Sequence, residues 1–113
     1  MTADVQVGGP ALIWCPFGEE ASAAAVAEQL LDEHLVACAN IMPGVRSLYR
    51  WHGERGDARE CAVLFKTDAR LLDRAIGRLC ALHPYDEPAA IGWRADSAAA
   101  STAAWLAGLA LDA

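Results

Sequence analysis

The stretch VACANIMPGVRSLYRW, residues 36–51, is rich in residues that favour β-strands and is interrupted once, at Pro43-Gly44. Side chains in a strand point alternately to its two faces. After the interruption, one face carries Val45, Ser47, Tyr49 and Trp51, and the other carries Arg46, Leu48 and Arg50. We expect one long strand with a bend or bulge at Pro43-Gly44, and we expect the face with Tyr49 and Trp51 to be buried.

Three other segments have the properties of strands. Residues 11–17, ALIWCPF, form a short apolar run whose length and aromatic content favour a buried strand over a helix. Residues 52–59 are polar and contain two glycines, which predicts a hairpin loop. Residues 61–67 then form an apolar strand that is predicted to pair antiparallel with the strand before the loop. Residues 89–95 are predicted to form a fourth strand.

Three segments are predicted to be helices. Residues 19–34 and 68–82 carry apolar side chains at intervals of three and four residues, which is the spacing of one helical face. Asp68 is a suitable N-cap for the second of these helices. Residues 97–111 are rich in alanine and are predicted to form a third helix.

The predicted order is strand, helix, strand, strand, helix, strand and one further helix. This order is the split βαβ pattern of an α+β, ferredoxin-like fold, in which two helices cover one face of an antiparallel sheet. We assign residues 11–113 to a single domain and residues 1–10 to a flexible N-terminal arm. The strands carry more large apolar side chains than one small core needs, which predicts an oligomer. These side chains are Tyr49, Trp51, Val63 and Phe65.

The net charge of −6 disfavours negatively charged partners, because it repels phosphate backbones and anionic lipids. The nearest basic cluster is interrupted by Glu54 and Asp57 and consists of Arg46, Arg50, Arg55 and Arg59. We therefore expect no nucleic-acid partner and no membrane partner. The N-terminus has no signal-peptide pattern, and no apolar run reaches the roughly 18 residues of a membrane span, so we expect a cytoplasmic protein.

The cysteines give no sign of a disulfide framework or a structural zinc site. Cys15, Cys38, Cys61 and Cys80 are widely separated, and no C-x-x-C motif occurs. Disulfides are rare in a reducing cytosol. Each cysteine is therefore interpreted first as a small buried hydrophobic residue, and no metal is expected to be required for folding.

The stretch LHPYDEP, residues 82–88, concentrates polar side chains between two prolines. Its first proline forces His83 out of helical geometry and ends the preceding helix. In one interpretation this is a stiff turn in which His83 caps the helix and Asp86 and Glu87 are solvated. In the other, the imidazole and both carboxylates bind a metal ion, and the Cys38 thiolate joins them from the second strand or a neighbouring subunit. No fixed metal-ligand spacing is present, so both interpretations stay open.

Lys66 is the only charge in the apolar strand of residues 61–67, where it is costly unless it is paired. We expect it to meet a carboxylate of the LHPYDEP turn or of another subunit, or to hold an anionic ligand. Tyr49 and Trp51 are interpreted as core or subunit-interface aromatics in preference to stacking platforms for a ligand.

Four motifs, taken together and in this order, resemble the CutA family of divalent-cation tolerance proteins. They are ACANI at residues 37–41, PGVRSLYRWHG at residues 43–53, FKT at residues 65–67 and the LHPYDEP turn. The similarity extends over nearly the whole chain. Two places depart from the family pattern: Ala89 stands where a glutamate is usual, and Trp14-Cys15-Pro16 replaces the usual threonines at the end of the first strand.

The resemblance implies a ferredoxin-like fold, a tight homotrimer and a part in tolerance of copper and other divalent ions. It also implies an architecture similar to that of PII signalling proteins, and no enzymatic reaction. We expect Cu(II) or another divalent cation as the bound ion. The site residues expected on this basis are Cys38, His83, Asp86 and Glu87 for the metal, Trp51, Lys66 and Tyr85 for a ligand pocket, and Tyr49 and Trp51 for the subunit interface.

Three hypotheses of function follow. The first is a trimeric, metal-responsive protein of CutA type that binds metal or a small ligand at inter-subunit clefts. The second is a PII-like signalling module that binds a small anionic metabolite and contacts a protein partner through residues 52–59. The third is a small enzyme with His83 as base and Cys38 as nucleophile. No activating motif supports the third hypothesis, and we expect no enzyme.

Overall fold

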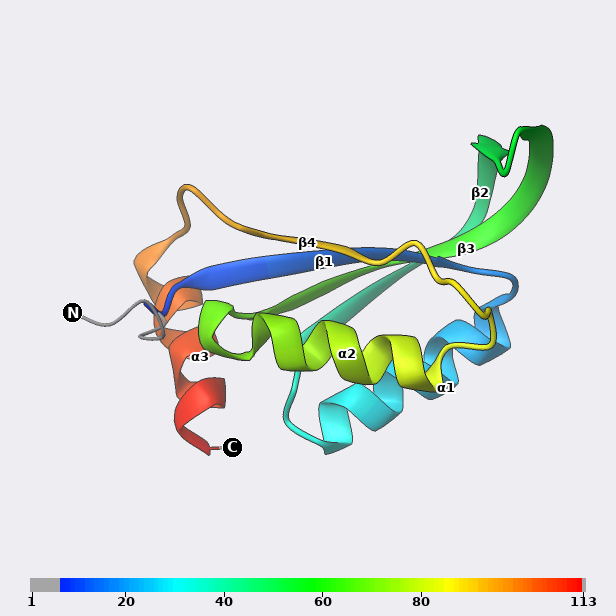
Figure 1. The fold of residues 1–113 in the computed structure, drawn as a ribbon. Helices are drawn as coiled ribbons and strands as arrows, with labels where there is room; N and C mark the ends of the chain where they lie inside the picture. Colours follow the sequence, from blue (N-terminus) through cyan, green and yellow to red (C-terminus); the bar gives the residue numbers. More distant parts are fainter. Residues whose placement is uncertain (1–6, 113) are drawn as a thin grey trace.

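The computed structural model describes residues 7–112, which form a four-stranded antiparallel sheet and three α-helices (Figure 1). In chain order the elements are β1 (Pro10–Phe17), α1 (Glu20–Asp32), β2 (Cys38–Trp51), β3 (Glu54–Asp68), the 3₁₀ turn η1 (Ala69–Leu71), α2 (Leu72–Leu82), β4 (Ile91–Arg94) and α3 (Ala100–Asp112). The order in the sheet is β2-β3-β1-β4. The predicted α+β class, element order and antiparallel pairing are confirmed.

The hydrophobic core lies between the sheet and the helices α1 and α2. Along β1, buried positions alternate strictly with half-buried ones, and Ile13 and Phe17 belong to the buried set. In the pairing of β1 with β3, Phe65 lies opposite Ile13 and Cys61 lies opposite Phe17. The helices contribute Ala23, Val26, Ala27, Leu30, Ala75 and Leu79 to the same cluster. Burial of each larger side chain contributes about 1.5–3 kcal/mol.

The helix ends follow local chemistry. The Asp68 side chain accepts a hydrogen bond from the backbone N–H of Arg70, as expected of an N-cap, and the turn that it caps is η1. Pro84 holds His83 at a φ of −68° and a ψ of 139°, so α2 ends at Leu82 as predicted. α1 ends at Asp32, before the predicted residue 34, because His34 adopts a left-handed φ of 58°.

The β2–β3 hairpin is longer and its turn tighter than predicted. A register shift between Met42 and Val45 confirms the bulge expected at Pro43-Gly44. The loop predicted for residues 52–59 is wrong, because β3 already begins at Glu54. His52 and Gly53 have φ values of 51° and 81°, as a two-residue turn between twisted strands requires. The polar residues that follow the turn therefore form an exposed strand instead of a loop.

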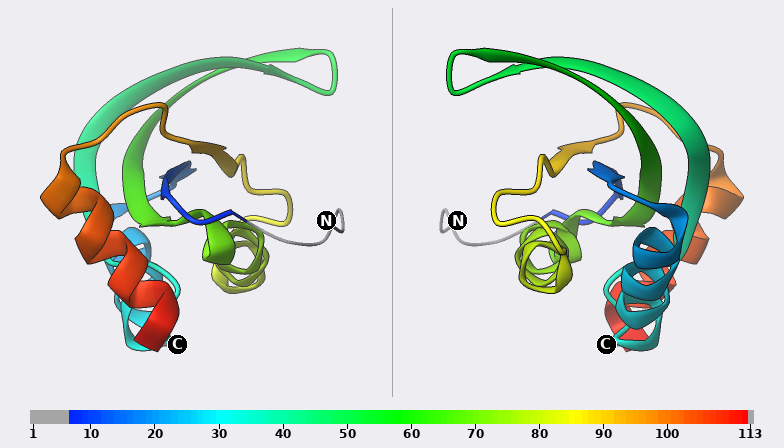
Figure 2. Two further views of the ribbon diagram at one scale, coloured as in Figure 1. Left: turned by 90° about the vertical axis from the view of Figure 1, so that its left-hand side faces the viewer. Right: turned by 90° about the vertical axis from the view of Figure 1, so that its right-hand side faces the viewer.

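The hairpin extends beyond the helices and curves over the opposite face of the sheet (Figure 2). No helix covers its Tyr49 side chain, which is 47% exposed, or its Trp51 side chain, which is 53% exposed. The prediction that this face is buried is therefore wrong for the single chain. Val63 and Phe65, grouped with these aromatics in the prediction, belong to the helix-covered core on the other face.

Residues 7–9 and α3 both lie at the end of the sheet where β1 begins. Residues 1–6 of the predicted N-terminal arm lie outside the described residues. Within residues 7–9, the Gly9 oxygen accepts a hydrogen bond from Ala69 at 2.8 Å, and the Val7 oxygen accepts one from the Arg94 side chain at 2.6 Å. α3 lies at the same end of the sheet, where the Arg70 side chain donates to the Ala107 oxygen at 3.4 Å (Figure 1).

Candidate functional site

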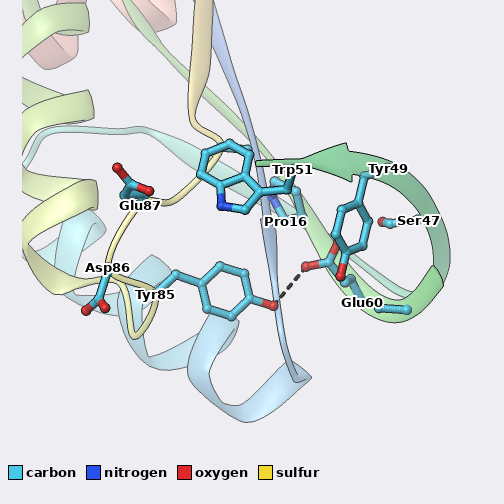
Figure 3. Close-up of a pocket in the computed structure, with 10 residues that line it drawn as sticks. Pro16, Ser47, Tyr49, Trp51, Glu60, Tyr85, Asp86 and Glu87 are labelled. Carbon is cyan, nitrogen blue, oxygen red and sulfur yellow. Dashed lines mark hydrogen bonds between the residues drawn. The ribbon is translucent and has the colours of Figure 1, made fainter. Parts of the chain in front are cut away.

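A cavity of about 580 Å³ opens on the sheet face that the helices leave uncovered. Three parts of the chain form its wall: the β2–β3 hairpin, the end of β1 and the LHPYDEP turn after α2. The lining residues are Pro16, Ser47, Tyr49, Trp51, Ala58, Glu60, Tyr85, Asp86, Glu87 and Ala89. Figure 3 shows Tyr49, Trp51 and Tyr85 around one space, with Glu60 between the two tyrosines.

The turn that supplies one wall is anchored by His83. Its Nε2 atom donates to the Pro16 oxygen at 2.9 Å, and its Nδ1 atom accepts from the Tyr85 backbone N–H at 3.0 Å. The imidazole also stacks on Phe17, with ring centroids 4.1 Å apart and an interplanar angle of 15°. Burial lowers the pKa of His83, and the two hydrogen bonds together fit the neutral ring. His83 therefore fixes the turn against β1.

Tyr85 joins the turn to β3. Its hydroxyl donates to the Glu60 carboxylate at 2.8 Å. Burial, followed by this bond and the Glu60 charge, raises the pKa of Tyr85 to about 12. The phenol is therefore protonated at neutral pH and holds Glu60 in the cavity wall.

The predicted metal ligands are only partly brought together. Asp86 and Glu87 both line the cavity. Both nitrogens of His83 are engaged in hydrogen bonds, and the Cys38 thiol lies at the start of β2, opposite Lys66, where its sulfur is 3.5 Å from the Asn40 side-chain oxygen. Within residues 7–112, no group of three or more His, Cys, Asp or Glu side chains is placed to hold a metal ion.

The predicted pocket residues are divided in a similar way. Trp51 and Tyr85 line the cavity, and Lys66 does not, since it lies between Leu12 and Cys38 in the sheet. Glu60 was missed, because residue 60 was assigned to the boundary between a loop and a strand. In the structure Glu60 pairs with Val45, which places it on the same face of the hairpin as Ser47 and Tyr49.

The four arginines of the basic cluster lie on the other face of the hairpin. Arg46 pairs with Arg59 across the strands and Arg50 with Arg55, while Arg46 also forms an ion pair with Asp57 at 2.8 Å. None of the cavity-lining residues is a lysine or arginine. The cavity wall is consequently acidic and aromatic. Ala89, where the family resemblance predicts a glutamate, also belongs to this wall.

The fold and the cavity define a class of small α+β domain in which a long β-hairpin curves over the open face of an antiparallel sheet. Residues 11–108 match the family described as CutA1 divalent ion tolerance protein. The chain therefore belongs to the CutA1 family of divalent-cation tolerance proteins.

Individual relatives agree with this assignment. The divalent-cation tolerance protein CutA of Thermus thermophilus is 42% identical over 69 residues, which cover 61% of this chain and 67% of that protein. The CutA homolog of Danio rerio is 32% identical over 96 residues, which cover 85% of this chain and 63% of that protein.

Solved structures show the same fold. The divalent ion tolerance protein CutA1 from Ehrlichia chaffeensis has a TM-score of 0.84 at 30% identity, covering 92% of this chain and 97% of that one. CutA from Xylella fastidiosa has a TM-score of 0.83 at 35% identity, covering 88% of this chain and 96% of that one. Within residues 7–112, the helices are too short or too polar to cross a membrane.

Proposed function

We propose that the chain acts as a homotrimer in the response to divalent metal ions, copper in particular, and binds the ion or a small ligand at clefts between subunits. The observation that carries this proposal is the open cavity with Glu60, Asp86 and Glu87 in its wall. Carboxylates are ligands for divalent cations. The relatives are named for divalent-cation tolerance, which supports the same role.

A neighbouring subunit would complete the metal site. Asp86 and Glu87 supply two carboxylates, and the Cys38 thiolate of another subunit is the proposed third ligand. His83 would have to release one of its two hydrogen bonds to bind a metal directly. We therefore assign it first to positioning the turn that carries the carboxylates.

The proposed trimer accounts for apolar surface that the single chain leaves exposed. β2 and β4 form the two edges of the sheet, and edge strands with free backbone groups favour pairing with another chain. Leu48, Ile91 and Trp93 are exposed on these strands, together with the interface candidates Tyr49 and Trp51. A partner subunit that covers Leu48, Ile91 and Trp93 would remove this surface from water, and Tyr49 and Trp51 would then border the cleft between the subunits.

We expect the protein to elute as a trimer in size-exclusion chromatography with light scattering at low micromolar concentration. The physical reason is the exposed apolar surface on both edge strands, whose burial favours association. A monomer that persists at this concentration would contradict the proposed assembly.

We expect Cu(II) to bind the trimer with a dissociation constant below about 1 mM in isothermal titration calorimetry. Replacing both Asp86 by Asn and Glu87 by Gln should weaken binding at least about tenfold, because each change removes a negatively charged ligand. Asp73→Asn is the matched control, since Asp73 is an exposed carboxylate on α2 outside the cavity. No heat of Cu(II) binding with the wild-type protein, or an equal loss of Cu(II) affinity in Asp73→Asn, would count against a metal site at Asp86 and Glu87.

The geometry of the cavity gives less support to the PII-like signalling module and to the enzyme. A small anionic metabolite finds no lysine or arginine in the cavity wall, so the PII-like alternative gains no support there. The proposed role is not enzymatic: His83 is held by Pro16 and Tyr85, and Cys38 lies elsewhere, at the start of β2. A cytoplasmic location is part of the proposal, although a structural neighbour from Archaeoglobus fulgidus is described as periplasmic.

A further inference from the structure

We propose that the cavity binds an organic cation with a quaternary ammonium group, held by the rings of Tyr49, Trp51 and Tyr85 and by the carboxylates around them. This inference deepens the proposed function and rests on it, because it names the class of small ligand that the inter-subunit cleft would take. Four properties of the cavity support this ligand class: its size, its rings, its charge and its rigidity.

The size of the cavity suits an organic molecule. Sites for small molecules and cofactors are typically about 300–1,000 Å³ in volume, and this cavity has about 580 Å³. A bare metal ion with its ligands close around it would occupy only a small part of this space. The volume is therefore unexplained by a metal ion alone.

The rings come from two separate parts of the chain and border one space. Tyr49 and Trp51 are next neighbours on the cavity face of β2, and Tyr85 projects from the turn after α2 (Figure 3). Among the described residues, the ring contacts of Trp51 and Tyr85 are with His52 and His83 and not with each other. Aromatic faces attract cations through the ring quadrupole, and sets of such rings recognise quaternary ammonium groups.

The charge of the wall selects a cation. Glu60, Asp86 and Glu87 are the ionisable carboxylates among the lining residues, and no lysine or arginine accompanies them. Glu87 has an ion-pair contact with His52, whose Nε2 atom is 3.6 Å from the carboxylate. Both side chains are exposed there. A quaternary ammonium group, which needs no hydrogen-bond acceptor, gains both the ring contacts and the Coulomb attraction.

Two of the wall residues are held in place before any ligand arrives. The Tyr85 hydroxyl is bonded to Glu60. The Tyr49 ring lies over Gly56 on the paired strand, in space that any Cβ at residue 56 would enter. Glycine at this position thus leaves room for the ring close to β3. A preorganised wall loses less conformational entropy when it binds a ligand.

The test compares choline with 3,3-dimethylbutan-1-ol, a neutral molecule of nearly the same shape, by isothermal titration calorimetry on the full-length wild-type protein. We expect choline to bind with a dissociation constant of about 1 mM or lower, and the neutral analogue to bind at least about tenfold more weakly. Equal affinity for the two molecules, or no binding of choline at about 20 mM, would overturn the proposal.

Variants locate the site. Trp51→Leu and Glu60→Gln are each expected to weaken choline binding at least about fivefold, because one removes a ring and the other a charge. Trp105→Leu is the matched control, since Trp105 is also a partly exposed tryptophan but lies on α3, away from the edge strands and outside the cavity lining. An equal loss of choline affinity in Trp105→Leu, or unchanged affinity in Trp51→Leu, would place the ammonium group elsewhere and overturn the assignment.

Copper titrations of the same samples separate this inference from the proposed function. Trp105→Leu should keep its affinity for both Cu(II) and choline, because Trp105 lies on α3 outside the cavity lining. Copper binding without choline binding would overturn the ammonium site alone. Choline binding without copper binding would overturn the metal site and leave the ammonium site standing.

Discussion

Replacement of Asp68 by alanine is expected to lower the free energy of unfolding by about 3 kcal/mol. The Asp68 side chain is completely buried, and it accepts hydrogen bonds from the Gly9 N–H at 3.3 Å and from the Arg70 N–H and Nε, both at 2.9 Å. Alanine leaves these donors without their acceptor and removes the cap of η1. It also loosens α3, because Arg70 reaches from Asp68 to the Ala107 oxygen.

Urea unfolding followed by circular dichroism measures this loss. Asp57→Ala is the matched control, since the Asp57 carboxylate also pairs with an arginine but is largely exposed, and such pairs contribute little. Similar losses of unfolding free energy in the two variants would show that burial does not set the strength of the ion pair between Asp68 and Arg70.

The same carboxylate makes the fold sensitive to acid. Burial opposes ionisation, but the Arg70 guanidinium and the backbone N–H groups of Arg70 and Gly9 outweigh it and hold the pKa of Asp68 below its ordinary value of 3.8. In the unfolded chain the carboxyl takes up its proton at the higher, ordinary pKa. The contribution of Asp68 is therefore complete above about pH 4 and is lost as the pH falls further.

Replacement of His83 by alanine is also expected to cost about 3 kcal/mol, because it removes a buried ring stacked on Phe17 and two hydrogen bonds. The Pro16 oxygen and the Tyr85 N–H then lose their partner. The turn with Tyr85, Asp86 and Glu87 should loosen, so that the cavity loses one wall as the protein loses stability.

A pH series distinguishes the neutral, buried imidazole from an exposed one. Burial lowers the pKa of His83 below the ordinary value of 6.5. As the pH falls through that value, the unfolded chain binds a proton that the folded protein does not, and stability declines. Urea unfolding at about pH 8 and about pH 5 should show this decline in the wild type and in His52→Asn, and a smaller one in His83→Phe. A larger decline in His83→Phe than in the wild type would contradict the assignment of His83 as the buried, neutral imidazole.

The predictions that succeeded depend on residues close together in the chain. The bulge at Pro43-Gly44, the cap at Asp68 and the helix end before Pro84 each follow from the conformational preferences of one or two residues. The start of β3 was missed because His52-Gly53 was not recognised as a complete two-residue turn. Polar residues beside two glycines suggest a loop, but cross-strand pairing keeps them in a strand.

The cavity could be predicted only in part, because its wall depends on the path of the whole chain. Tyr85, Asp86 and Glu87 were found through the LHPYDEP turn. Glu60 reaches the cavity through the register of the hairpin, and Pro16 through its position at the end of β1. The curvature that carries Tyr49 and Trp51 over the open face arises from the twist of two long strands, which local propensity does not describe.

The position of β1 has a consequence for the order in which the molecule forms. β1 is a central strand, and both of its partners, β3 and β4, follow it only after long intervening segments. The β2–β3 hairpin joins neighbouring segments and closes a short loop, which costs little chain entropy. During synthesis this hairpin can therefore form early. β1 therefore lacks both of its sheet partners until β3 and β4 have been synthesised, and the sheet is completed only when β4 pairs with β1.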